Sequence, residues 1–339
     1  MILGALLLLL YKFNPLLAYE SLFAGGFGSL YGWAESLANA TPLILTALTF
    51  AVGLRGGLFN IGAEGQVYVG ALAAVATGLL PVPAALRLIV TLVLALAAGA
   101  LWGLVPALLK MTRGVHEVIS TIMLNWIAYF FAFYLIAHTL SSPLNGSRTI
   151  RIPPAARFGV ILPGTDLNYG ILVSILLALL FYFLLWRTTV GFELRAVGYN
   201  PRAAHYAGMD EHSIGHWAFL LGGVSAGLAG AVQLMGRPPS YAILSGIPQL
   251  LNLGFDGIGV AMIGRNHPLG ILLAAVFFGG LEAGGRTMEL VAGVPLEMVR
   301  VVEGLILIAL AVPELGRFLT YLRHLNPLEL LSRQRRRAD

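Results

Sequence analysis

The sequence contains no cysteine and very little charge. The absence of cysteine excludes disulfide bonds, a catalytic thiol and any metal site built on cysteine ligands. Charged residues make up 11% of the chain, whereas a soluble globular domain carries about 25%. So few charges cannot cover the surface of a soluble domain of this size. The composition therefore indicates an integral membrane protein.

Lysine is scarce as well, because Lys12 and Lys110 are the only two. No Gly-Lys dipeptide occurs, so the chain lacks the P-loop that binds nucleotide phosphates. Its net charge of +5 comes mostly from arginine, and in a membrane protein such an excess reports loop orientation rather than nucleic-acid binding. We expect no cofactor in this chain and no nucleic-acid partner. Any ATP would be hydrolysed by another chain.

Apolar residues dominate what remains, at 58% of the chain with a mean hydropathy of +0.83. The apolar runs are too long and continuous for barrel strands, so they indicate helices. We predict one all-α transmembrane domain over residues 1–339, a polytopic bundle with broken helices. The about ten expected spans are 1–17, 37–52, 67–80, 86–109, 115–138, 168–186, 217–235, 254–263, 271–290 and 298–312. Residues 20–36 are expected to form a polar connection.

The longest polar interruption is the loop 188–213. Asn200 is a good helix cap, Pro201 suits the first helical position, and Gly208 suits the residue after the last. These signals predict a short helix of about two turns between Pro201 and Gly208. Such a capped surface helix is suited to binding by another protein. The alternative is an ordinary cytosolic loop.

A second polar interruption, 53–66, joins two apolar runs without a long loop. It holds five glycines together with Asn60, Glu64 and Gln66. Irregular backbone at membrane depth is tolerated where it lines a cavity, as in the discontinuous helices of transporters. A tight turn at the membrane surface is the other interpretation. Asn125, inside an apolar run, is either a pathway group or an interhelical hydrogen-bonding residue. These four polar residues are our candidates for lining a pathway.

The positive charges predict the orientation of the loops. Lys110 with Arg113, the loop 188–213, Arg265 and the basic tail 314–339 are expected in the cytoplasm, and both chain ends with them. Alternation between spans agrees with this assignment. It places the loop 141–167 outside, although that loop carries three arginines.

Two sequence patterns resemble functional motifs but lack the surrounding structure or ligands that such motifs need. Ser225 lies in Gly-Val-Ser-Ala-Gly, which matches a hydrolase nucleophile motif but falls inside an apolar run, where small residues favour helix packing. His205, His212 and His216 lie close together in sequence near the loop 188–213, where surface histidines are far commoner than a metal site. We therefore expect neither a catalytic residue nor a metal site.

Five motifs, in order, carry a family resemblance. They are GGLFNIGAEGQ at 56–66, EVISTIMLN at 117–125, GFELRAVGYNPRAAHYAG at 191–208, FDGI at 255–258 and GRNHPLG at 264–270. Together they resemble the permease subunit of bacterial ABC importers, in the nucleoside and simple-sugar branch of the branched-chain amino acid/ribose permease superfamily. The resemblance covers about residues 37–312.

The resemblance implies partners and roles. A cytoplasmic ABC ATPase, a second permease of the same or a sister chain, and a lipid-anchored solute-binding protein outside the cell would complete the importer in a bacterial cytoplasmic membrane. The loop 188–213 would then be the coupling loop that docks in the ATPase. The coupling residues expected from the motif are Arg195, Gly198, Asn200, Pro201, Ala203, Ala204, Tyr206, Ala207 and Gly208.

The expected cargo is a nucleoside, with purines favoured, or alternatively a monosaccharide such as ribose. A self-contained ion-coupled carrier using Glu64, Asp256 and Glu303 as proton sites is a distant alternative, as is an intramembrane hydrolase using Ser225.

Overall fold

The computed structural model describes residues 2–143, 145–238 and 240–311. The helices in this part are α1 Ile2–Leu10, α2 Pro15–Phe27, α3 Leu30–Arg55, α4 Ala63–Ala76, α5 Ala84–Arg113, α6 Glu117–His138, α7 Gly170–Arg187, α8 Thr189–Tyr199, α9 Pro201–Tyr206, α10 Glu211–Met235, α11 Leu253–Ile263, α12 Pro268–Ala292 and α13 Leu296–Ala311. Two short strands, β1 Ser141–Ser142 and β2 Asn145–Thr149, pair antiparallel. The predicted tail 314–339 lies outside the described residues.

The prediction of an all-α polytopic bundle is confirmed. Six helices in the described ranges are long and apolar enough to cross a membrane, namely α3, α5, α6, α7, α10 and α12. The pair α1 and α2 passes the same test together but is bent by 120°. The apolar runs at α4, α11 and α13 give helices of 14, 11 and 16 residues, shorter than a full span of about 20. The count of about ten spans is therefore not confirmed.

The prediction of a polar connection over 20–36 is wrong. Helix α2 continues to Phe27 and α3 begins at Leu30. The glycines that suggested a loop instead let helices approach closely, since a Cβ at Gly26 would lie 2.2 Å from the carbonyl oxygen of Gly280 in α12. The small residues in this segment therefore allow close packing of α2 against α12 and do not form a turn.

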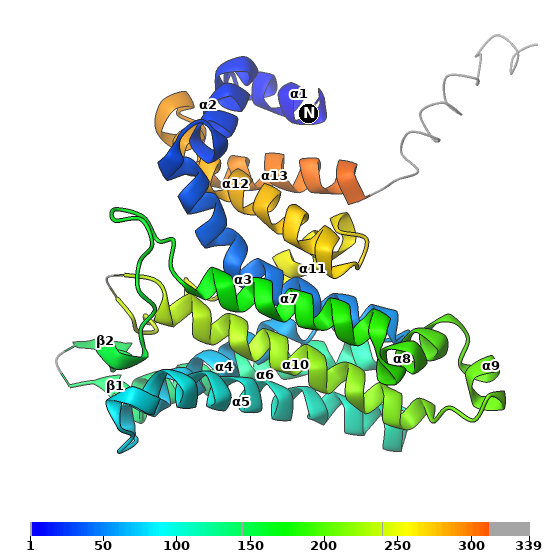
Figure 1. The fold of residues 1–339 in the computed structure, drawn as a ribbon. Coiled ribbons are helices and arrows are strands. Elements are labelled where there is room, and N and C mark those ends of the chain that lie inside the picture. The colour runs from blue at the N-terminus through cyan, green and yellow to red at the C-terminus, as the bar shows by residue number, and fades with distance from the viewer. Residues whose placement is uncertain (1, 144, 239, 312–339) are drawn as a thin grey trace, which may run out of the picture.

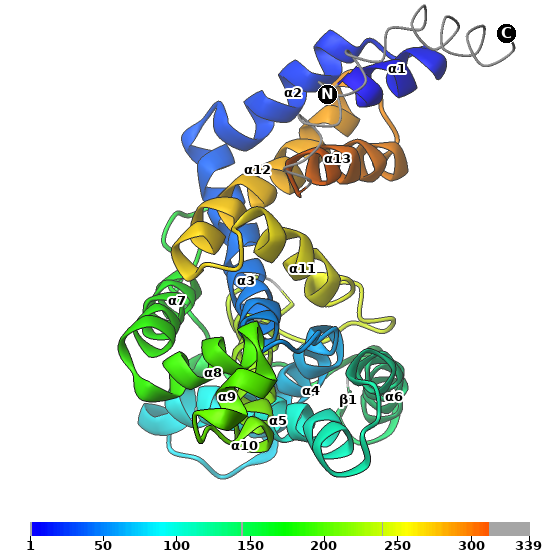
Figure 2. The ribbon, with the colours of Figure 1, turned by 90° about the vertical axis from the view of Figure 1, so that its right-hand side faces the viewer.

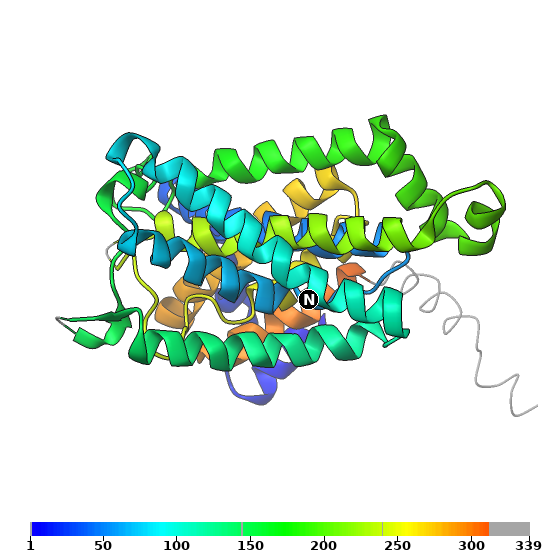
Figure 3. The ribbon, with the colours of Figure 1, turned by 90° about the horizontal axis from the view of Figure 1, so that it is seen from below.

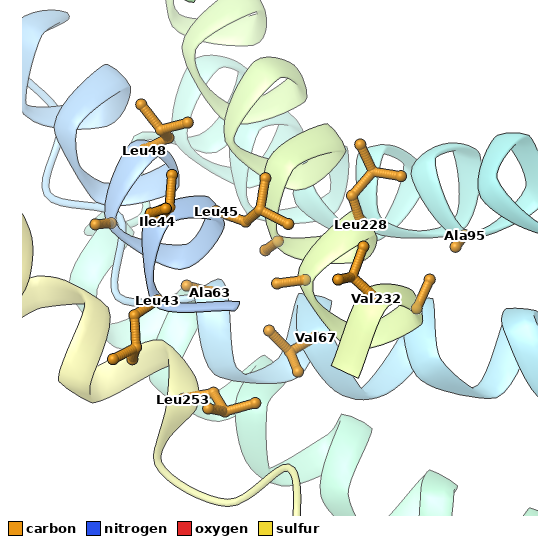
Figure 4. Packing of buried hydrophobic residues seen from close by; sticks show 14 of the residues in the cluster. Leu43, Ile44, Leu45, Leu48, Ala63, Val67, Ala95, Leu228, Val232 and Leu253 are labelled. Carbon is orange, nitrogen blue, oxygen red and sulfur yellow. The ribbon is translucent and has the colours of Figure 1, made fainter. Parts of the chain in front are cut away.

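The helices form two groups joined through α3 (Figures 1 and 2). The main core lies where α3 and α10 pack with α4 and α5, and Figure 4 shows Leu45, Val67 and Leu228 meeting there, all with 5% or less of their surface exposed. A second apolar cluster joins α1, α2, α12 and α13 through residues such as Leu22 and Met288. The bundle therefore has two cores with a boundary between them.

Ser225 lies within the main core and has a packing role. It is fully buried inside α10, and its Oγ donates a hydrogen bond to the carbonyl oxygen of Leu45 at 2.7 Å. Two residues on, a Cβ at Gly227 would lie 2.3 Å from the carbonyl oxygen of Ala95 in α5. No strand-to-helix turn presents the hydroxyl, so the structure offers no support for a hydrolase.

The two ends of the bundle differ (Figures 1 and 3). Helices α8 and α9 lie at one end and the β1–β2 hairpin at the other. Arg265 and the α5 terminus lie at the α8–α9 end, because Arg265 contacts Arg55 and Met111 contacts Gly215 at the start of α10. The predicted interruption 53–66 is present as a break at residues 56–62 between α3 and α4.

Candidate functional site

A polar cavity of about 510 Å³ lies at the boundary between the two helix groups. Its walls come from α3, α10, α11, α12 and α13 and from Arg237 and residues 248–252, which lie between α10 and α11. The lining residues are Asn39, Pro42, Gln233, Arg237, Pro248, Gln249, Leu251, Asn252, Leu253, Phe255, Asp256, Phe278, Glu282, Arg286, Arg300, Glu303 and Gly304. Its volume falls within the range of small-molecule sites.

Three carboxylates from three different helices face this cavity: Asp256 of α11, Glu282 of α12 and Glu303 of α13. Arg300 lies close enough to interact electrostatically with all three of them. Within the described part of the chain, none of these carboxylates forms a direct ion pair. Their hydrogen-bonding capacity is therefore open to a bound molecule or to water.

Arg237 fixes the edge of the cavity nearest the β1–β2 hairpin. Its Nη2 donates to Oδ1 of Asn39 at 2.6 Å, and its Nη1 pairs with Oδ2 of Asp166 at 3.3 Å. The backbone N–H of Asp166 in turn donates to Oε1 of Glu35 at 2.8 Å. These contacts tie the loop 141–167 and the end of α10 to α3.

Glu64, a predicted pathway residue, lies behind the cavity wall at the start of α11. Its Oε1 accepts the backbone N–H of Asn252 at 2.6 Å, and its Oε2 accepts that of Gly254 at 2.7 Å. It also accepts a short hydrogen bond from the Tyr68 hydroxyl. A carboxylate at this position satisfies N–H groups that a helix N-terminus leaves unpaired and complements the helix dipole.

The other three predicted pathway residues gather around the break 56–62. Asn125 of α6 accepts from the N–H of Gly65 at 2.9 Å and donates to the carbonyl of Ile61 at 3.0 Å. Asn60 accepts the N–H of Gly62 at 2.9 Å. Its Nδ2 and the Oε1 of Gln66 are both buried and have no hydrogen-bond partner among the described residues. Neither these three residues nor Glu64 is among the lining of the polar cavity.

The predicted short helix in the loop 188–213 is present as α9. Asn200 caps it, with Oδ1 accepting the N–H of Ala203 at 3.1 Å, Pro201 is its first residue, and Gly208 follows it with φ of +83°. Ala204 packs inward with 4% exposure, whereas Tyr206 is 92% exposed. Ala207, just after α9, is also exposed. Here the helix presents a polar and aromatic surface outward.

Helix α8 connects this exposed segment to the bundle. A Cβ at Gly198 would lie 2.0 Å from the carbonyl oxygen of Arg55, so α8 touches the end of α3. The guanidinium groups of Arg195 and Arg55 both lie over the ring of Trp186, at 5.6 and 5.3 Å from its centroid. Arg55 also donates to the carbonyls of Asn266 and Arg265 between α11 and α12. Movement of α8 would therefore reach both α3 and α11.

His267 completes this contact. Its ring lies 4.5 Å from that of Trp186, and its Nδ1 accepts the N–H of Leu269 at the start of α12. Burial, and to a smaller degree the charge of Arg55, lowers the pKa of His267 below its usual value. The imidazole is therefore held neutral more readily than an exposed histidine.

The sequence did not identify the polar cavity as one site. Nothing in the sequence indicated that Asn39, Gln233 and Arg237 belong to a site. They lie near the ends of apolar runs, where polar residues are common. Glu282 and Glu303 were visible as acids inside apolar runs, which is costly in lipid and marks functional positions. Their meeting with Asp256 depends on tertiary packing between helices.

Comparison with known proteins identifies relatives over most of the chain. Residues 32–311 match the family model described as branched-chain amino acid transport system / permease component. The chain is 40% identical over 312 residues to the guanosine ABC transporter permease protein NupP of Bacillus subtilis, covering 91% of this chain and 89% of the relative.

Two further relatives show similar coverage. The nucleoside ABC transporter permease protein NupB of Lactococcus lactis is 35% identical over 324 residues, covering 92% of this chain and 87% of its own. The glucose ABC transporter permease protein TsgB13 of Haloferax volcanii is 33% identical over 330 residues, covering 92% and 84%. No solved structure matches the chain.

Proposed function

The chain belongs to the family of the permease component of the branched-chain amino acid transport system, and from that premise we propose that it is the membrane subunit of an ATP-driven importer of nucleosides. The resemblance drawn from the five motifs is thereby confirmed. The chain is a transport subunit rather than an enzyme. The observation that carries the cargo proposal is the 40% identity to a guanosine permease over nearly the whole chain.

The loop 188–213 is proposed as the contact with the ATPase. Its exposed helix α9 is capped at both ends, and α8 joins it to α3 and to the turn between α11 and α12. ATP binding elsewhere would close the ATPase and move α9 as a rigid body, and α8 would transmit that movement into the bundle. Arg195, through Trp186, and Gly198, through Arg55, are the residues proposed to carry the motion.

The remaining parts of the importer are proposed from the family. They are an ABC ATPase that uses ATP and magnesium, a second permease of the same or a sister chain, and an extracytoplasmic solute-binding lipoprotein. The α8–α9 end and both chain ends would face the cytoplasm of a bacterium, and the loop 141–167 would face outward. The bent pair α1–α2 and the short helices α4, α11 and α13 would bring the membrane-embedded segments to ten.

Asn60, Glu64, Gln66 and Asn125 stay our proposal for residues along the pathway. All four are buried polar groups, with 6% exposure or less. Glu64 lies at the start of α11, behind the polar cavity, and the other three lie around the break 56–62, beside α4 and α6. A pathway there would run from that cavity past the break 56–62 toward α8.

A monosaccharide is the second candidate cargo, because the glucose permease relative is 33% identical. Calorimetry with the solute-binding protein encoded beside this chain separates the two. We expect micromolar or tighter binding of nucleosides, purines above all, and no binding of monosaccharides. Binding of sugars alone would replace the nucleoside proposal with the sugar, and absence of any neighbouring binding protein and ATPase would count against an importer of this kind.

A further inference from the structure

The charged residues of the polar cavity are unusual for apolar helices. Glu282, Arg286 and Arg300 are exposed side chains on α12 and α13, two helices whose other residues are mostly apolar. Charges facing lipid are costly, and in membrane proteins they face water-filled cavities or protein. The face that holds this cavity is therefore hydrated or covered by protein rather than by acyl chains.

The cavity has no excess of positive charge. The carboxylates of Asp256, Glu282 and Glu303 face the guanidinium groups of Arg286 and Arg300, while the third lining guanidinium, that of Arg237, is already paired with Asp166. A site for a phosphorylated ligand would carry an excess of positive charge. A mixed set of acceptors and donors without that excess instead suits a neutral molecule with many hydroxyl, amide and ring-nitrogen groups.

Aromatic rings also line the cavity. Phe255 is among the lining residues and is 45% exposed in total, and Phe278 contributes a second, mostly buried ring. Flat aromatic faces bind nucleobases by stacking, whatever the base. The cavity thus combines a stacking surface with carboxylates that accept hydrogen bonds from hydroxyl groups.

We propose that the polar cavity is a substrate chamber that binds an unphosphorylated nucleoside during transport, with Phe255 against the base and the carboxylates of Asp256 and Glu303 accepting hydrogen bonds from its sugar hydroxyls and N–H groups. The proposal rests on the proposed function. It assigns the substrate contacts to α11, α12 and α13 rather than to the break 56–62. It also excludes nucleotides as cargo.

The absence of cysteine makes the chamber directly testable. Gly304 lines the cavity, and a Cβ there meets no atom of the described part of the chain within 4 Å, so Gly304→Cys is well tolerated sterically. Leu251→Cys is a second reporter, because Leu251 lines the cavity with 39% exposure. Gly146→Cys, in the β1–β2 hairpin, is the matched control with equal free space. Each variant is placed in the complete reconstituted importer and treated with a water-soluble methanethiosulfonate reagent.

We expect all three cysteines to react, and guanosine to slow labelling at residues 304 and 251 but not at residue 146. At a ligand concentration about ten times its dissociation constant, mass action predicts roughly tenfold protection. Guanosine monophosphate and glucose should give none. Absence of labelling at both reporters, protection by glucose or the monophosphate, or no protection of either reporter by guanosine although the importer with the wild-type chain transports guanosine, would overturn the chamber. Failure of the wild type to transport any nucleoside would instead overturn the proposed function.

Discussion

The carboxylate of Glu64 accepts the backbone N–H of Gly254 at 2.7 Å and so joins the start of α4 to the start of α11. The two residues are 190 positions apart. The contact leaves no room for adjustment, because a Cβ at Gly254 would lie 2.2 Å from the backbone nitrogen of Glu64. One buried side chain thus sets the position of α11, which forms a wall of the polar cavity.

Replacing Glu64 with alanine should destabilise the protein strongly. The change leaves the N–H groups of Asn252 and Gly254 without their acceptor. Hydrogen bonds to a charged group contribute about 1.5–3 kcal/mol each, so the loss should be about 3 kcal/mol or more. Glu64→Gln keeps one acceptor and should lose about half of this.

The melting temperature in detergent measures this effect. The control is Glu289→Ala, which removes an exposed acidic side chain near the end of α12. An unchanged melting temperature for Glu64→Ala would show that Glu64 does not hold α11.

The contact between Gly198 and Arg55 predicts a loss of coupling in Gly198→Ala. A methyl group there would lie 2.0 Å from the Arg55 carbonyl and force α8 away from α3. ATP hydrolysis by the assembled importer should continue while uptake per ATP falls about tenfold, an effect of about 1.4 kcal/mol on the transport step. Gly146→Ala, with no atom within 4 Å of the added carbon, should behave as wild type. Full uptake in Gly198→Ala would remove α8 from the transmission path.

Gly208 predicts a separate loss at the ATPase contact. With φ of +83°, the backbone strongly disfavours a β-branched residue, so Gly208→Val should distort the end of α9 with little effect on the buried core. Binding of this variant to the ATPase, measured by co-purification, should weaken. The control Gly293→Val introduces the same strain, at φ of +66°, at the end of α12. Equal loss in both variants would mean that strain alone, not the α9 surface, is responsible.

His267 predicts a pH dependence. Its pKa in the folded protein is lowered, first by burial and then by Arg55, so on acidification the unfolded chain takes up a proton before the folded one does. Stability contributed by neutral His267 is therefore present above its unfolded pKa, and it falls between about pH 7.5 and pH 5.5. His267→Asn keeps a capping acceptor for Leu269 and removes the titration.

Melting temperatures measured across that pH range should fall more steeply in the wild type than in His267→Asn. Parallel curves would show that this histidine does not titrate differently on folding.

The sequence patterns predicted local structure more accurately than they predicted how the helices pack together. The cap at Asn200, the first position at Pro201 and the stop at Gly208 depend only on neighbouring residues, and all three are present around α9. The glycines of residues 20–36 misled the prediction because Gly26 is needed for contact with α12, a partner over 250 residues away.

The polar cavity shows the same limit. Asp256, Glu282 and Glu303 lie in three separate apolar runs, and only the packing of α11, α12 and α13 brings them together. The role of Glu64 was equally hidden, since its N–H partners lie almost two hundred residues away. A buried acid signals that a partner exists, but it does not identify the partner.

The measurement that tests the central claim most directly is uptake of labelled guanosine into proteoliposomes containing this chain and the partners proposed for it: a second permease of the same or a sister chain, an ABC ATPase and a solute-binding protein. The account predicts uptake that requires ATP, stops with a hydrolysis-deficient ATPase and persists when a protonophore collapses the proton gradient. Uptake that continues without the ATPase and stops with the protonophore would contradict it, and would point instead to a self-contained carrier using Glu64, Asp256 and Glu303.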